Sequence, residues 1–247
     1  MEKQIADQRL RVRIGIVGGL GAKTSCDLFY NLNEKVRENF NFQPEIVMEN
    51  VSVSKDAEKK IINGCISREM RQALFVAIKN LNKTNVDFIA IPCNSVHIFL
   101  KDLQKSSCKP ILNIPKLCAK RCKDLGLRKV GILGTQITIN HGLHQKALFR
   151  EGINAVVPAE KTQSKINKAI LFILNNENQK RAKRLLEEGM FELKNSGVQA
   201  VILGCTDIQI VLDVKKSSIP IIDTLEILEN SLISLITKDE RREIYAK

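Results

Sequence analysis

The sequence contains no tryptophan and only two tyrosines and nine phenylalanines, so few aromatic side chains are available to stack on nucleic-acid bases. It also contains no apolar run near the roughly 20 residues that a membrane-spanning helix needs. The first thirteen residues mix acidic and basic side chains and contain no apolar segment typical of a secretory signal. We therefore expect a cytoplasmic protein that binds neither nucleic acid nor membrane.

The sequence also has no excess of acidic residues and no Cys-x-x-Cys pair. Its 39 lysines and arginines against 27 aspartates and glutamates give a net charge of +12, and they are scattered through helical segments rather than massed in a tail. We interpret them as a solvated surface that can also attract a small acidic substrate. The seven cysteines lack the spacing of zinc ligands, so we predict no metal site and expect reduced thiols.

Two stretches of the chain repeat one pattern, an apolar strand that ends in a polar turn with a cysteine at its tip. Residues 87–97 (DFIAIPCNSVH) carry Cys93, and residues 199–207 (QAVILGCTD) carry Cys205, which lies 205 − 93 = 112 residues later. A strand that runs into a glycine turn also occurs twice, at 13–21 and at 129–135. Self-similarity at one long offset predicts two similar half-structures.

Apolar strands alternate with helical patterns along the chain. We expect strands near 13–18, 45–53, 88–92, 110–114, 129–134, 153–157, 200–203 and 220–222, and a polar loop with one helical turn at 54–67. This alternation predicts an α/β fold of two similar lobes with mostly parallel sheets and a site in the cleft between them, at the carboxyl ends of the strands. We place the first lobe at 9–114, completed by a C-terminal helix at 225–247, and the second lobe at 115–224.

The two matched cysteines are the candidate catalytic residues. A thiol at a strand end, just before a helix, should have a lowered pKa, because the helix dipole and free N–H groups favour the thiolate. Cys93 and His97 are also compatible with a hydrolase nucleophile and base, but a hydrolase gives no reason for a second matched thiol. Two thiols on opposite faces of one molecule can remove a proton from a stereocentre and return one from the other side. We interpret the remaining five cysteines as structural.

The chain resembles the cofactor-independent aspartate/glutamate racemases from about residue 14 to residue 236. The resemblance rests on IGIVGGLG at 14–21, PCNSVH at 92–97, LGT at 133–135, LGCTD at 203–207 and PIIDT at 220–224. It implies two lobes related by pseudo-twofold symmetry and a reaction that needs no pyridoxal phosphate or other cofactor, and we expect a homodimer. Asp207 stands where the family commonly has glutamate.

The resemblance also implies roles for particular residues. It makes Cys93 and Cys205 the two catalytic bases. The implied substrate-binding residues are Gly19, Leu20, Lys60, Asn94, Ser95, Thr135, Lys165 and Thr206. Lys165 is the first candidate to bind a side-chain carboxylate and Lys60 is the next, although a lysine in a polar stretch is commonly just solvated.

The resulting hypothesis is a racemase whose substrate is a small acidic amino acid, aspartate or glutamate. Two alternatives stay open. One is a catalytically silent protein of the same fold that binds a dicarboxylate or an amino acid. The other is a relative that acts on another acid, such as a hydantoin or a malonate.

Overall fold

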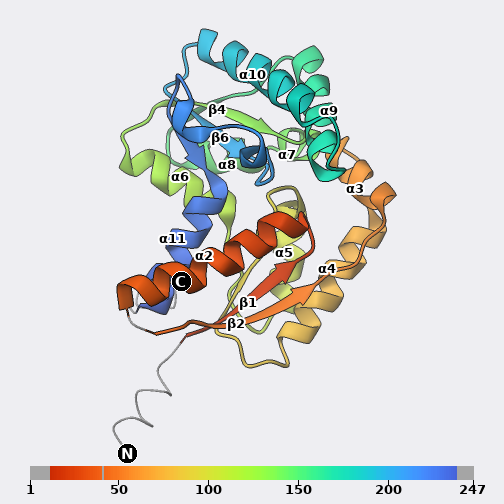
Figure 1. Ribbon diagram of the computed structural model, residues 1–247, viewed down its shortest axis with the longest axis vertical. Coiled ribbons are helices and arrows are strands. Elements are labelled where there is room, and N and C mark those ends of the chain that lie inside the picture. Colours follow the sequence, from red (N-terminus) through yellow and green to blue (C-terminus); the bar gives the residue numbers. More distant parts are fainter. Residues whose placement is uncertain (1–11, 41, 238–247) are drawn as a thin grey trace, which may run out of the picture.

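The computed structural model describes residues 12–40 and 42–237, and the first of its two sheets is built from the N-terminal part of the chain (Figure 1). Strands β1 (Arg13–Gly18), β2 (Glu45–Asn50) and β3 (Phe88–Ala90) pair in parallel in the order β2-β1-β3. Where a fourth strand was predicted at 110–114, the structure has a single parallel bridge between Ile89 and Ile111. The strand is cut short because Asn113 caps a helix that already begins at Ile114.

The second sheet repeats this order with a complete fourth strand. Strands β4 (Lys129–Gly134), β5 (Asn154–Val156), β6 (Ala200–Gly204) and β7 (Ile221–Asp223) pair in parallel in the order β5-β4-β6-β7. All five residues of β6 are buried, as expected for a parallel strand that helices cover on both faces. The predicted α/β fold with two parallel sheets is confirmed, and the equivalent strand orders account for the sequence repeat.

Helices connect the strands and cover the sheets. The α-helices are α2 (Ala22–Phe40), α3 (Lys55–Ile62), α4 (Arg68–Leu81), α5 (Leu100–Ser106), α6 (Ile114–Asp124), α7 (Gln136–Asn140), α8 (Leu143–Arg150), α9 (Glu160–Leu174), α10 (Gln179–Asn195) and α11 (Thr224–Ile236). Short 3₁₀ helices are η1 (Ser95–Phe99), η2 (Ile208–Ile210) and η3 (Val214–Lys216). No helix within the described ranges has the length and apolarity that crossing a membrane requires.

The buried apolar side chains form three cores. The central core is shared by the two sheets and includes Ile14 and Ile16 of β1, Val130 and Ile132 of β4, and Leu228 of α11. A second core lies between the first sheet and helices α4 and α5, and a third lies between the second sheet and helices α9 and α10. The shared central core joins the two halves into one body, in which α11 descends from the upper half beside α2 (Figure 1).

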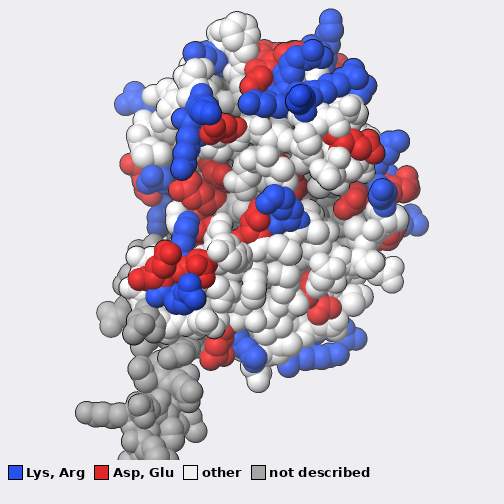
Figure 2. All heavy atoms as spheres, viewed as in Figure 1, with Lys and Arg blue, Asp and Glu red and all other residues white. Residues whose placement is uncertain are grey.

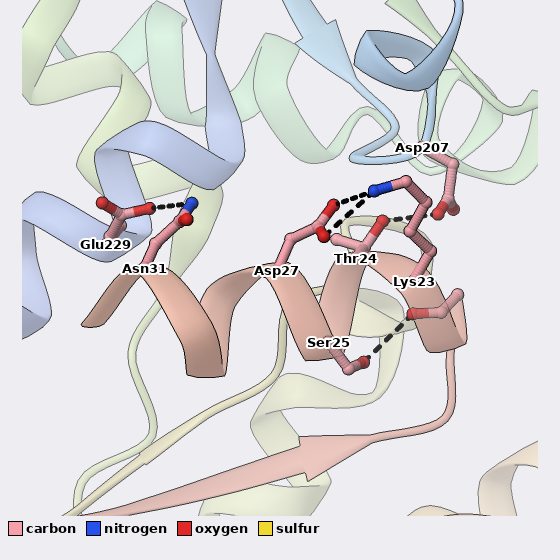
Figure 3. A network of polar contacts seen from close by, with 8 residues as sticks. Lys23, Thr24, Ser25, Asp27, Asn31, Asp207 and Glu229 are labelled. Carbon is pink, nitrogen blue, oxygen red and sulfur yellow. Dashed lines mark hydrogen bonds and ion pairs between the residues drawn. The ribbon is translucent and has the colours of Figure 1, made fainter. Parts of the chain in front are cut away.

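Helices α2 and α11 are joined by polar contacts. Asn31 of α2 donates a hydrogen bond of 3.1 Å to the Glu229 carboxylate of α11, and Lys35 forms an ion pair with the same carboxylate. Figure 3 shows Asn31 and Glu229 facing each other across these helices. The division into 9–114 with 225–247, and 115–224, stays a proposal, and residues 9–11 and 238–247 lie outside the described part.

The basic side chains are spread over the surface, with one concentration. Figure 2 shows lysines and arginines gathered at the top of the molecule, over α10, while acidic and basic groups are interspersed elsewhere on this face. The first turns of α10 supply Lys180, Arg181, Lys183 and Arg184. These side chains lie at the far end of the upper half, as expected for a solvated helix face.

Candidate functional site

Both matched cysteines line one small pocket between the two halves of the molecule. The pocket has a cavity volume of about 40 Å³ and opens to solvent, and its walls come from both halves of the chain. Cys93 follows β3 and Cys205 follows β6, so each thiol lies at the carboxyl end of a central strand, where ligands bind in parallel sheets. Ser95 and Thr135 line the same pocket.

The two thiols have the same backbone environment. The backbone N–H groups of Ser95 and Val96 hydrogen-bond Cys93 at the start of η1, and those of Asp207 and Ile208 hydrogen-bond Cys205 at the start of η2. In each case the donors are two and three residues beyond the cysteine. Backbone donors in this arrangement stabilise a sulfur that carries negative charge.

The lowered pKa that the sequence predicted for these thiols is wrong. Burial raises the pKa of Cys93 to about 12, and the negative charge of Asp207 adds to the rise. The same two causes, in the same order, raise the pKa of Cys205 well above its ordinary value. Part of Cys93 is exposed, yet its sulfur lies deep enough among protein atoms that lost hydration outweighs the backbone N–H groups. Burial and the charge of Asp207 therefore favour the neutral thiol at both positions.

Asp207 connects Cys205 to the first half of the molecule. The Cys205 thiol donates to Asp207 Oδ2 across 3.9 Å, and the Thr24 hydroxyl donates to Oδ1 across 2.6 Å. Figure 3 shows the Asp207 carboxylate directed toward the start of α2. Gly21 makes room for it, because a Cβ there would lie 2.5 Å from Oδ1 and the backbone has φ +87°. Burial raises the pKa of Asp207, while its bonds with Thr24 and Cys205 oppose the rise.

Hydroxyl groups at the junction bond across the two halves. Ser95 Oγ and Thr135 Oγ1 lie 2.8 Å apart, and the Thr206 hydroxyl donates to the Pro92 carbonyl across 3.0 Å. Ser95 and Thr135 line the pocket, whereas Thr206 lies beside it in the buried junction. Their role as substrate contacts stays a prediction, and the contacts present fix the position of each cysteine turn.

Asn94 and His97 hold the first cysteine turn. The Asn94 amide donates to Thr224 Oγ1 and its carbonyl oxygen lies 2.9 Å from His144 Nε2, so this predicted substrate contact is engaged with the second half. His97 Nδ1 lies 2.9 Å from the Cys93 carbonyl oxygen, and its Nε2 accepts from a backbone N–H. His97 thus contacts the backbone of Cys93 through Nδ1, and its described hydrogen bonds do not include the Cys93 sulfur.

Of the predicted substrate contacts Gly19 and Leu20, Leu20 reaches the pocket lining. Leu20 lines the pocket, and Gly19 precedes it at φ +86°, where a Cβ would lie 2.5 Å from the Val51 carbonyl oxygen. Gly19 therefore shapes the turn that carries Leu20.

The two predicted lysines are paired with acids outside the pocket. Lys60 Nζ lies 2.7 Å from an oxygen of Asp56, and Lys165 Nζ lies 2.6 Å from an oxygen of Glu188. Neither lysine is part of the pocket lining. Binding of a substrate carboxylate by either lysine stays a prediction that requires the present ion pair to break.

Helix α3 supplies a wall of the pocket that the sequence interpretation missed. The stretch 54–67 was predicted as a loop with one helical turn, but it forms the eight-residue helix α3. The Ser54 hydroxyl caps this helix by accepting from the Ala57 N–H. Glu58, Ile61 and Ile62 of α3 line the pocket. The capping serine and the apolar spacing of Ala57 and Ile61 were the available signals.

The pattern of the protein family described as Asp/Glu/Hydantoin racemase matches residues 17–231 of this chain. The chain belongs to this family. Its similarity to the broad specificity amino-acid racemase RacX of Bacillus subtilis is 28% identity over 222 residues, 90% of this chain and 96% of that protein. The aspartate racemase of Picrophilus torridus shares 26% identity with a TM-score of 0.77, covering 91% of this chain and 94% of the other.

A second solved structure extends the same likeness. PH1733 of Pyrococcus horikoshii, an aspartate racemase homologue, shares 27% identity with a TM-score of 0.70, covering 91% of this chain and 99% of the other. The resemblance inferred from the motifs is thereby confirmed at the level of the family.

Within the described residues, no group of three or more histidine, cysteine or acidic side chains is arranged to hold a metal ion.

Proposed function

We propose that this chain racemises amino acids through Cys93 and Cys205, without a cofactor. The observation that carries the proposal is that two thiols from the two halves line one pocket in matching backbone environments. One sulfur, as thiolate, takes the proton from Cα, and the electron pair of the C–H bond passes into the carboxylate group. The other sulfur, as thiol, gives a proton to the opposite face, so the configuration at Cα inverts.

The Cys205 thiol has a proton acceptor beside it. Asp207 Oδ2 accepts its hydrogen bond, and burial raises the pKa of this carboxyl group, which makes it a better proton acceptor. By resemblance to glutamate racemases, Cys205 acts on the L-enantiomer and Cys93 on the D-enantiomer. The Ser95 and Thr135 hydroxyls line the pocket as donors for the substrate carboxylate, where negative charge develops.

The resemblance to aspartate and glutamate racemases favours an acidic amino acid as one candidate substrate of this reaction. Its side-chain carboxylate needs a cation, because a buried unpaired charge is strongly disfavoured. This candidate therefore requires Lys60 or Lys165 to leave Asp56 or Glu188 and turn into the pocket.

Proton exchange at Cα tests the reaction. The purified protein, with no cofactor added, is incubated in deuterated water with single enantiomers of acidic, basic and neutral amino acids, and α-proton loss and chirality are followed. Cys93→Ser and Cys205→Ser should each lower racemisation by about 10²–10⁴-fold, the usual contribution of a general acid or base. One enantiomer should still exchange in one of these variants.

Cys26→Ser is the matched control, because Cys26 is exposed and outside the pocket lining, and it should retain the parent rate. Racemisation at the parent rate in either pocket variant contradicts the two-thiol mechanism. An absence of exchange with every amino acid favours the catalytically silent binding protein.

A further inference from the structure

The pocket that holds the two thiols is lined by acidic side chains and by no basic side chain of the described residues. Its lining includes Glu58 and Asp207, and no lysine, arginine or histidine of residues 12–40 and 42–237 is part of it. Lys23 at the start of α2, which Figure 3 shows beside Asp207, places its ammonium 2.8 Å from an oxygen of Asp27. A side-chain carboxylate entering the pocket as it stands would meet two acids and no cation of the lining, while Lys55 acts on Glu58 from outside the lining.

Glu58 differs from Asp207 in having no hydrogen-bond or ion-pair partner in the described part of the chain. Asp207 accepts from Thr24 and from Cys205, whereas the Glu58 carboxylate forms no hydrogen bond or ion pair with any described residue. Burial raises the pKa of Glu58 and the charge of Asp207 adds to the rise, while Lys55 opposes it. A cation placed beside Glu58 would relieve both unfavourable effects.

The surroundings of Glu58 fit an aliphatic chain that ends in a cation. Ile61 and Ile62 lie three and four residues beyond Glu58, on the same face of α3, and all three line the pocket. Ile170 and Leu174 of α9 complete this apolar wall. The helices α3 and α9 lie next to each other at the right of the molecule, where α3 spans the two halves (Figure 1).

The two acids are placed for two different cations. A substrate Cα between the thiols puts its α-ammonium close to Asp207, because Asp207 Oδ2 is 3.9 Å from the Cys205 sulfur. That leaves Glu58, on the α3 wall, for a second cation at the end of the side chain. Resting on the function proposed above, we infer that the substrates are basic amino acids, with Glu58 selecting the cationic side chain.

Lysine and norleucine provide a matched substrate pair, because norleucine has the same carbon chain and lacks the terminal ammonium. The parent protein should have a kcat/KM for L-lysine that exceeds that for L-norleucine by about ten- to a hundredfold, the range of one charge-assisted hydrogen bond. Glu58→Gln should bring this ratio close to one, and Glu58→Lys should shift the preference toward L-glutamate. Asp102→Asn is the control, because Asp102 pairs with Arg71 and lies outside the pocket lining, and it should keep the parent ratio.

Calorimetric binding of lysine and norleucine to the parent and to Glu58→Gln gives a readout that does not need turnover. Tighter binding of lysine that disappears in Glu58→Gln supports the inference even where the exchange assay shows no racemisation, in which case only the proposed function fails. A parent that prefers glutamate, or a lysine preference that Glu58→Gln leaves unchanged, overturns the inference while leaving the two-thiol reaction intact.

Discussion

Replacing Asp207 by asparagine should make both pocket thiols easier to ionise. The substitution keeps the size of the side chain and removes a charge that raises the pKa of Cys93 and of Cys205 after the effect of burial. At the 3.9 Å between Asp207 Oδ2 and Cys205 Sγ, two unit charges interact by about 4 kcal/mol at an effective dielectric constant of about 20. Even about a third of that energy raises the thiolate population about tenfold.

The assay is the rate of alkylation by iodoacetamide at one mildly alkaline pH, resolved for each cysteine by peptide mass spectrometry. Cys205 should be alkylated at least about tenfold faster in Asp207→Asn than in the parent. Cys118 is the internal control, because its pKa is also raised by burial but not by Asp207. Turnover should fall at the same time, because the α-ammonium of the substrate loses its partner.

One comparison decides whether the electrostatic reasoning holds. If the Cys205 rate, divided by the Cys118 rate, is the same in both proteins, Asp207 does not control the ionisation of the thiol and the electrostatic reasoning is refuted. Asp213→Asn provides the matched variant, because Asp213 is paired with Lys216 outside this pocket and should change neither rate.

Two further predictions concern stability. Gly21→Ala should lower the free energy of unfolding by about 1–2 kcal/mol because of its positive φ, and it should also displace Asp207. Gly126→Ala, at φ +67° with nothing within 4 Å of its Cβ, should carry the backbone cost alone. Thermal melting and turnover are measured for both variants, and an equal loss of turnover would contradict the role of Gly21. Burial, with the nearby His97, lowers the pKa of His144 from 6.5 to about 3. The stability that neutral His144 contributes is therefore present above pH 6.5 and is lost as the pH falls toward 3. Urea unfolding across this pH range should show a shallower loss of stability in His144→Gln than in the parent.

The sequence contained enough information to predict the positions of the two thiols. Cys93 and Cys205 each follow an apolar strand in a duplicated segment, and parallel strands of one sheet end at the same edge. The helix predicted from residue 225 corresponds to α11, which begins at Thr224. The predicted strand at 110–114 failed because a capping asparagine and a helix start compete for the same residues.

The charge environment of the pocket was not predictable in the same way. The sequence gives the donors near each thiol, but the pKa depends on how much water burial removes and on the nearness of Asp207, which tertiary structure decides. Glu58 escaped notice because it belongs to a polar segment whose amphipathic turn is short, and only the packing of α3 across the two halves brings it to the cysteines. Lys60 and Lys165 were implied by the family resemblance, which does not reveal their acidic partners.

The raised pKa values bear directly on the proposed reaction. One thiol must ionise before it can take a proton, and in the free protein burial and the charge of Asp207 both oppose that step. An α-ammonium beside Asp207 would cancel the second cause, and the loss of a carboxylate charge by proton transfer from Cys205 would do the same. Formation of the thiolate is then coupled to the arrival of a substrate cation. A site that carries two acids and two neutral thiols thus becomes reactive when an amino acid brings positive charge into it, which agrees with a substrate that carries a second cation for Glu58.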